Sequence, residues 1–200
     1  MKRSFILTGI LLYTIVLPSF SQQPPGKGKF TNFTEGGVLL GNSQDEKKAP
    51  FIFNSAMNYG LFKNLSAGIG VGVEFLKETY LPLTANVMYQ FRKDKAVFPF
   101  IRLRAGYQVA LESAANMDNY NYSLPLASYV YPYYPTVTKL NAKGGWMFDP
   151  SVGVIVYTRP GLGISLAAGY RYQKLKYAGD NDYIFWTEYN RLILTLGITF

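Results

Sequence analysis

Acids and bases that fall on the polar side of alternating segments are the residues of this chain most able to do chemistry. Six are expected to share one interior: Glu74, Asp149, Arg102, Arg104, Arg171 and Arg191. Glu35 is a further, weaker candidate. Isolated charges in a confined space are heavily penalised, so such groups pair and hydrogen-bond. We therefore expect a plug held by complementary charge, in preference to a gated pore.

Other reactive chemistry has little support in the sequence. The 200 residues contain no His and no Cys, whereas a Ser or Thr nucleophile ordinarily needs a His base and thiolate metal sites need Cys. Asp180 and Asp182 alone are weak evidence for calcium. Ser–Lys and carboxylate-only mechanisms stay open, although no spacing favours them. We predict no catalytic residue, no cofactor and no metal site, and hence no enzymatic activity.

Alternating segments of about ten residues must position these charges, as transmembrane β-strands do. In 66–76, for example, Ala67, Ile69 and Val71 share one face while Gly68 and Gly70 share the other. The apolar parity is almost free of charge, which suits lipid, and the polar parity is rich in Gly, which suits a narrow lumen. The pattern predicts an all-β fold, an eight-stranded antiparallel up-and-down transmembrane β-barrel. The expected strands are 30–41, 51–62, 66–76, 80–91, 96–110, 144–157, 162–174 and 190–200.

The connections between these strands differ in length. The second, fourth and sixth, at 63–65, 92–95 and 158–161, are short, whereas 42–50, 111–143 and 175–189 are longer or polar. The short turn near 77–79, where we expect Glu78 to be solvated, breaks the trend. Short periplasmic turns and longer outer loops are typical of outer-membrane barrels. We expect both termini to be periplasmic and the long loops to be extracellular.

Aromatic residues are concentrated in two of the long connections. Rigid aromatic surfaces on loops are common in recognition, so these residues are candidates for binding a surface protein or glycan. The alternative is that they extend the strands and form an outer aromatic girdle. The candidates are Tyr129, Tyr131, Tyr133, Tyr134, Tyr183 and Trp186.

The N-terminal residues predict a secretory signal peptide over 1–21. Lys2 and Arg3 precede an apolar run over 5–17, and small residues stand at Ser19 and Ser21. The remaining 22–200 is expected to form a single domain. The formal net charge is +8. Export argues against nucleic acid as a partner; the excess charge meets either lipopolysaccharide phosphates or only solvent.

The last expected strand, 190–200, has apolar residues at every second position. Leu192, Leu194, Leu196, Ile198 and Phe200 share one apolar face, which resembles the C-terminal assembly signal of outer-membrane barrels. Four further segments carry a wider resemblance: 34–42 (TEGGVLLGN), 78–83 (ETYLPL), 99–107 (PFIRLRAGY) and 168–173 (AGYRYQ). With them, most of 22–200 resembles the small eight-stranded barrels of the OmpA-transmembrane-domain or OmpX type, in particular the subfamily called the outer membrane protein β-barrel domain.

The resemblance implies an integral outer-membrane protein of a Gram-negative-type envelope, with a structural or surface-interaction role through its loops. The partners that it implies are outer-membrane lipid, lipopolysaccharide and the barrel-assembly machinery. Two alternatives stay open: a narrow small-solute channel and an envelope lipid-modifying enzyme. The eight-stranded lipid A-modifying enzymes rely on a catalytic His, which this chain lacks.

Overall fold

The computed structural model describes residues 27–41, 49–91, 97–111, 115–116, 139–159, 162–179 and 184–200. The predicted signal peptide and Tyr129, Tyr131, Tyr133, Tyr134 and Tyr183 lie outside the described residues. The described residues form nine strands: β1 (Phe30–Leu40), β2 (Phe51–Gly60), β3 (Leu65–Phe75), β4 (Thr79–Gln90), β5 (Val97–Ala110), β6 (Ala115–Asn116), β7 (Lys139–Arg159), β8 (Leu162–Gly179) and β9 (Ile184–Thr199).

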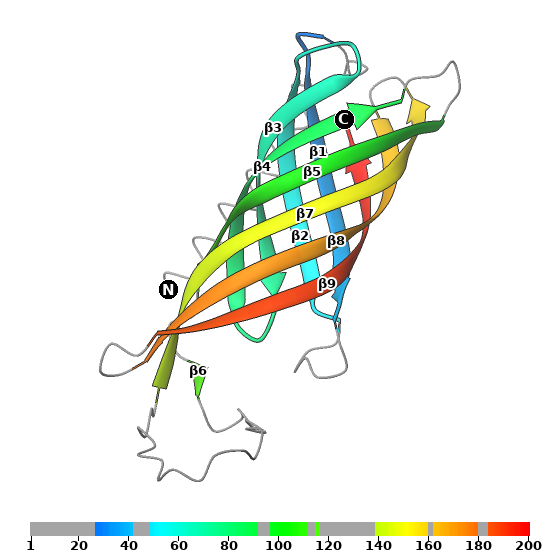
Figure 1. Ribbon diagram of the computed structural model, residues 1–200. Helices are drawn as coiled ribbons and strands as arrows, with labels where there is room; N and C mark the ends of the chain where they lie inside the picture. Colours follow the sequence, from blue (N-terminus) through cyan, green and yellow to red (C-terminus); the bar gives the residue numbers. More distant parts are fainter. Residues whose placement is uncertain are drawn as a thin grey trace, which may run out of the picture.

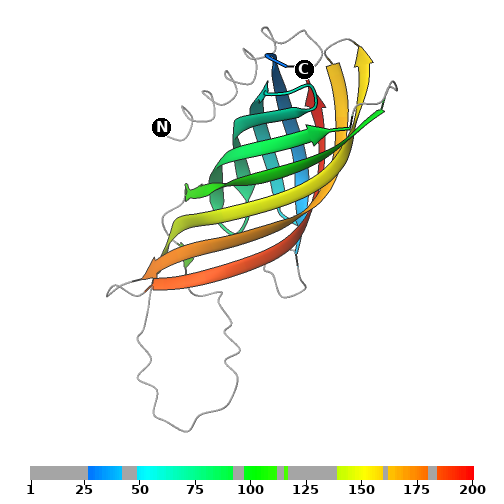
Figure 2. The same cartoon turned by 45° about the horizontal axis from the view of Figure 1, so that its top comes forward.

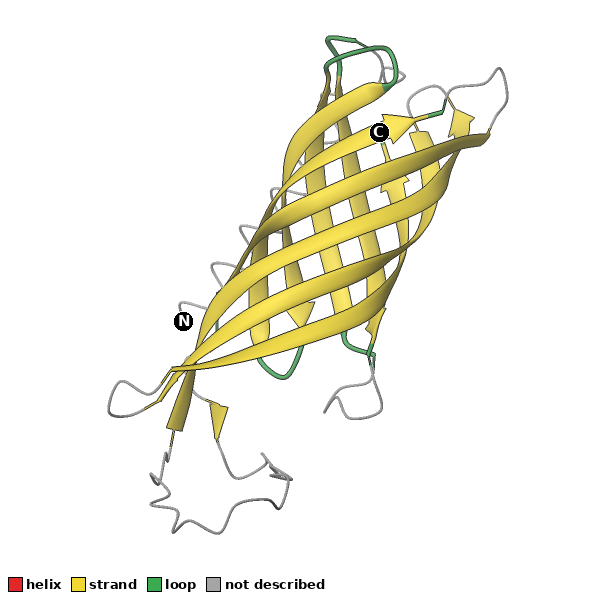
Figure 3. Ribbon diagram, in the orientation of Figure 1, coloured by secondary structure: helices red, strands yellow, loops and turns green. Residues whose placement is uncertain are grey.

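Eight of these strands close into a barrel. Each long strand pairs antiparallel with its sequence neighbours, β5 pairs directly with β7, and β9 returns to pair with β1 (Figure 1). The two-residue β6 pairs only with the start of β7. Strands make up the whole wall (Figure 3), and a second view shows how steeply they slant around it (Figure 2). The predicted eight-stranded antiparallel barrel is confirmed.

No helix among the described residues is long and apolar enough to span a membrane.

Two backbone hydrogen bonds continue the β1–β9 ladder past the last strand residue, from Asn32 N to Phe200 O at 2.7 Å and from Phe200 N to Asn32 O at 3.1 Å. We call this end of the barrel the Phe200 end and the opposite one the distal end.

Three strands are longer at the distal end than the sequence pattern predicts. β7 starts at Lys139 instead of 144, β8 ends at Gly179 instead of 174, and β9 starts at Ile184 instead of 190. The expected loops at 111–143 and 175–189 are therefore wrong for 139–143, 175–179 and 184–189, and also for the two residues of β6. The reason is that β8 and β9 continue their ladder through Leu175↔Thr187 and Tyr177↔Phe185. Figure 1 shows the three strands running on together.

The two faces of the wall are inverted relative to a soluble barrel. Side chains of the expected assembly signal point outward, with Leu192 58% and Leu196 61% exposed, while inward Arg171 and Glu74 are fully buried. Aromatic pairs flank the aliphatic outer surface: Phe30 with Tyr59 (ring centroids 5.0 Å apart) at the Phe200 end and Tyr107 with Trp146 (5.3 Å) at the distal end. This arrangement suits an apolar surrounding bounded by two polar interfaces.

Two apolar clusters fill the lumen on either side of its charged middle, and the sequence pattern did not predict them. The cluster nearer the Phe200 end consists of Phe33, Met88, Phe100, Ile155 and Ala167. The cluster nearer the distal end consists of Leu39, Ile52, Leu76, Tyr80, Ala142, Leu175, Tyr177 and Ile193. An eight-stranded barrel leaves an interior that side chains can fill, so these clusters enclose the polar residues between them.

Inward glycines on β3 make room for amide side chains from β2. A Cβ at Gly68 would lie 2.1 Å from Met57 O and 2.2 Å from Asn58 Oδ1. At Gly72 it would lie 2.2 Å from Asn54 Oδ1. Because Gly68 and Gly72 have no side chains, β2 and β3 can approach each other this closely.

We predict that Gly68→Ala destabilises the barrel, because the added Cβ collides with backbone; overpacking of this kind costs about 1–3 kcal/mol. The matched control is Gly36→Ala, where the nearest atom to an added Cβ is Phe51 Cζ at 3.4 Å. Urea unfolding of the detergent-solubilised protein measures both. Equal unfolding midpoints for the two variants would contradict the close approach at Gly68.

Candidate functional site: a buried charge network in the lumen

Glu35 of β1 is the centre of one half of the network. Its Oε2 accepts a hydrogen bond from Arg102 Nη1 at 2.9 Å, and its Oε1 forms a close ion pair with Arg104 Nη2. Arg102 Nε also donates to Ser151 Oγ at 3.3 Å. Both arginines come from β5, across the lumen from β1, so a single carboxylate connects two walls of the barrel.

Arg171 of β8 is the centre of the other half. Its Nη2 donates to Asp149 Oδ2 at 2.9 Å, and its Nη1 forms a close ion pair with Glu74. Two amides complete the shell of Glu74: Gln108 Nε2 and, at 3.2 Å, Gln173 Nε2 both donate to its Oε2. An arginine that contacts two carboxylates gains charge-assisted hydrogen bonds on both sides.

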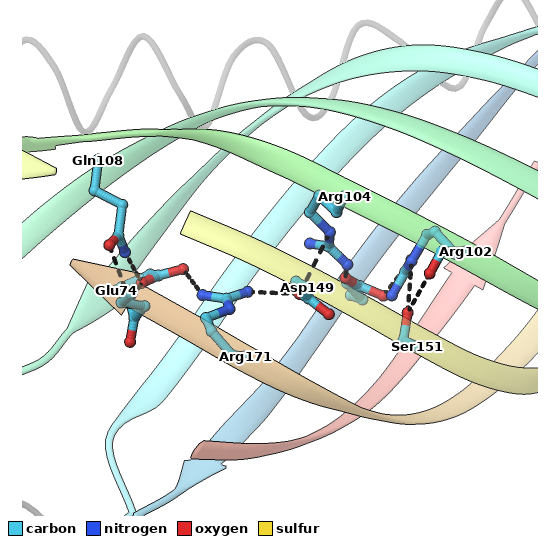
Figure 4. Close-up of polar contacts among 9 residues, drawn as sticks. Glu74, Arg102, Arg104, Gln108, Asp149, Ser151 and Arg171 are labelled. Atoms are coloured by element: carbon cyan, nitrogen blue, oxygen red, sulfur yellow. Dashed lines mark hydrogen bonds and ion pairs between the residues drawn. The ribbon is translucent and has the colours of Figure 1, made fainter. Parts of the chain in front are cut away.

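Asp149 joins the two halves, because its Oδ2 also lies 3.7 Å from Arg104 Nε. Figure 4 shows the network running along the lumen from Gln108 and Glu74 to Arg102 and Ser151. Its three carboxylates face three guanidinium groups, so the formal charges balance: Glu35, Glu74 and Asp149 against Arg102, Arg104 and Arg171. Each of these side chains is at most 5% exposed.

Five of the six residues expected in the interior are thus brought together, and Glu35, the weakest candidate, belongs with them. Arg191, the sixth, is buried and stands opposite Arg171 in the β8–β9 register. Its guanidinium carbon lies 4.8 Å from the centroid of the Tyr189 ring. The aromatic face supplies a favourable electrostatic contact for this cation.

The expectation that Glu78 is solvated in the short turn between β3 and β4 is wrong. Glu78 is 3% exposed, and its Oε2 accepts hydrogen bonds from Tyr80 OH at 3.1 Å and Tyr177 OH at 3.2 Å. The two hydroxyls also lie 3.1 Å apart. The β8 extension carries Tyr177 over the short β3–β4 turn, which explains why a turn residue is buried. The sequence carries one signal of this buried contact. Tyr80 has the same strand parity as the inward Thr84, which directs its side chain into the lumen.

Trp186 lies on β9, where a loop was expected, and it is 46% exposed. Its candidate role in recognition stays a prediction. Among the described aromatic residues of this region, the alternative of strand extension therefore applies. Tyr177, Phe185 and Tyr189 lie on the same extended β8 and β9.

Metal ligands do not gather in the part of the chain that the structure describes. No group of three or more His, Cys, Asp or Glu side chains lies close enough there to hold an ion. Glu35, Glu74 and Asp149 face guanidinium groups instead, an arrangement suited to fixing the walls together.

Comparisons with known proteins agree on the architecture. No family model matches the chain, and no curated protein matches its sequence. Among solved structures, Neisserial surface protein A superposes with a TM-score of 0.53 at 12% identity, covering 85% of this chain and 95% of that one. This chain has the fold of the small outer-membrane β-barrels.

Two further structures give the same result. The N-terminal β-barrel domain of Pseudomonas aeruginosa OprF matches with a TM-score of 0.53 at 10% identity, covering 88% of this chain and 100% of that one. The outer membrane protein OprG from Pseudomonas aeruginosa matches with a TM-score of 0.52 at 10% identity, covering 90% and 97%. Identities this low carry the fold and leave the function to be argued from this chain's own residues.

We predict that Glu74→Gln lowers the free energy of unfolding, because it leaves part of the Arg171 charge uncompensated inside the barrel. Breaking a buried pair costs roughly 3–5 kcal/mol; Asp149, which still contacts Arg171, should reduce this figure. The control is Glu188→Gln, since Glu188 is 50% exposed in its pair with Lys174 and exposed pairs contribute about 0–1 kcal/mol. Urea unfolding in detergent measures both variants.

A double variant separates pairing from simple loss of a side chain. If the charges are coupled, Glu74→Gln combined with Arg171→Met should cost less than the sum of the two single variants. Strict additivity, or a Glu74→Gln variant as stable as wild type, would contradict the plug.

Proposed function

We propose that the protein is a non-enzymatic integral protein of a Gram-negative-type outer membrane. Its closed barrel is the membrane anchor, and its distal connections act at the cell surface. The observation that carries the proposal is the inverted wall: a buried, charge-balanced interior inside an aliphatic exterior. Exposure of this aliphatic exterior to water would cost much free energy, whereas lipid solvates it.

The outer surface has the layering of a bilayer. Aliphatic side chains such as Ile69, Leu103 and Leu196 are 69%, 48% and 61% exposed in its middle. Aromatic pairs border them at both ends, where amphipathic rings favour the membrane–water interface. This supports insertion with the barrel axis across the membrane.

The lumen supports a structural role in preference to transport. An ion moving through it would have to displace the two apolar clusters and separate the paired charges between them. The same pairing occupies the acids and bases that a hydrolytic enzyme would need free. A narrow channel and a lipid-modifying enzyme are thus the less favoured functions.

The connections support an orientation. Segments 42–48 and 180–183 and the stretch between β5 and β7 all join strands at the distal end, and 61–64 and 92–96 join them at the Phe200 end. Since outer-membrane barrels carry short periplasmic turns and longer outer loops, we place the distal end outside and both termini in the periplasm. A surface protein or glycan is the partner class for the outer loops. The outward Leu192–Phe200 face is the surface for the assembly machinery.

We predict that the protein fractionates with outer membranes and that an epitope inserted within 121–130 is reached by antibody on intact cells. An epitope within 92–96 should become accessible only after permeabilisation. Recovery of the protein from the periplasm without detergent would contradict the location. Reversed accessibility of the two epitopes would contradict the orientation alone.

We predict little or no ion conductance in planar bilayers, because the two apolar clusters and the charge network between them occupy the lumen. The measurement uses protein that migrates faster unboiled than boiled, which verifies a closed barrel. Steady single-channel currents from such protein would favour the small-solute channel.

A further inference from the structure

The outward side chains of β8 change character along the strand. Leu162, Ile164, Leu166 and Ala168 come first, Tyr170 and Tyr172 follow, and Lys174 and Lys176 come next, before the small Ala178. Alternate residues of a strand share a face, so one row passes from aliphatic through aromatic to cationic. That is the order of hydrocarbon, interface and headgroup in one leaflet of a bilayer.

Both lysines converge on one indole ring. Lys174 Nζ and Lys176 Nζ each lie 5.7 Å from the centroid of the Trp186 ring, which β9 presents beside them. Cation–π contacts of this kind hold an ammonium group in place without neutralising it. The two positive charges therefore remain close together on the outer surface.

A single carboxylate among the described residues accompanies the two cations. Glu188 Oε1 lies 2.9 Å from Lys174 Nζ, and no described carboxylate forms an ion pair with Lys176. A second tryptophan, Trp146, stands opposite Lys174 in the β7–β8 register and is 66% exposed. We call Trp146, Lys174, Lys176 and Trp186 the Lys–Trp patch. It carries an excess of positive charge next to two large aromatic surfaces.

We propose that the Lys–Trp patch binds the phosphate headgroup of an anionic lipid in the outer leaflet, namely the lipid A part of lipopolysaccharide. This inference rests on the proposed membrane location. Lys174 and Lys176 contact the phosphate, and the two indoles lie against the sugar and the upper acyl chains. Nothing in the lumen takes part, because Lys174 and Lys176 point away from it.

Continuity with the aliphatic surface selects a lipid over a soluble anion or an acidic protein. Tyr170 stands directly opposite Leu192, and Lys174 follows four residues later on the same face of β8. A phosphate held by the lysines would therefore have its acyl chains beside the aliphatic rows of β8 and β9. Lysines near an anionic membrane surface contribute about 1 kcal/mol each, which corresponds to roughly fivefold in affinity per residue.

The test uses the full-length mature protein in phosphatidylcholine nanodiscs that contain bisphosphorylated lipid A or the same lipid without phosphates. Lipid co-purifying after detergent extraction is counted by mass spectrometry. Wild type should retain the phosphorylated form preferentially. In Lys174→Gln/Lys176→Gln this preference should fall about tenfold. The fall is smaller than the product of two fivefold effects because Glu188 already pairs with Lys174. The charge-matched control, Lys27→Gln/Lys29→Gln, lies at the Phe200 end and should behave as wild type.

Additional measurements distinguish a lipid headgroup from free phosphate. They also distinguish failure of this proposal from failure of the proposed membrane location. Inorganic phosphate at millimolar concentration should not displace the lipid; if it does, the site is a free-anion site and the proposal is wrong. Trp186→Leu should weaken retention while leaving both charges in place. Equal losses in the two double variants would overturn the patch. A protein that enters nanodiscs but shows no phosphate preference refutes this inference alone, whereas failure to enter bilayers refutes the membrane location.

Discussion

Charge balance inside a narrow, closed wall is the constraint on which the rest of this structure depends. Eight strands leave no room for bulk water around a buried guanidinium, so each of Arg102, Arg104 and Arg171 must face a carboxylate. These partners come from β1, β3 and β7, whereas the arginines come from β5 and β8. The ion pairs of Glu35 and Glu74 therefore link strands that are not neighbours in the sheet, β1 with β5 and β3 with β8.

The same network specifies strand register. A slip of one residue would turn Glu35 or Arg171 toward the apolar exterior and Leu192 or Leu196 toward the lumen. Both faces would be mismatched at once, since one requires paired polar groups and the other requires apolar ones. Register is thus fixed from both sides of the wall.

The ends of the lumen follow a different rule from its middle. Apolar side chains close it on both sides of the charges, and at the distal end Glu78 and two tyrosine hydroxyls share hydrogen bonds within that apolar cluster. The extended β7–β9 sheet makes this possible, because it carries Tyr177 inward and Trp186 outward on neighbouring strands. One extension thereby seals the interior and shapes the outer surface.

The sequence by itself determined the architecture and the faces, because alternation of period two is a local property: Leu194 and Thr195 point to opposite sides whatever the neighbouring strand is. It also identified most of the buried charges. Only the tertiary structure decided their partners, as Glu35 shows, because the stagger of closed strands sets which side chains meet across the lumen. Likewise, Glu78 is buried and Trp186 lies on a strand because the β8–β9 ladder continues where each segment alone has the composition of a loop.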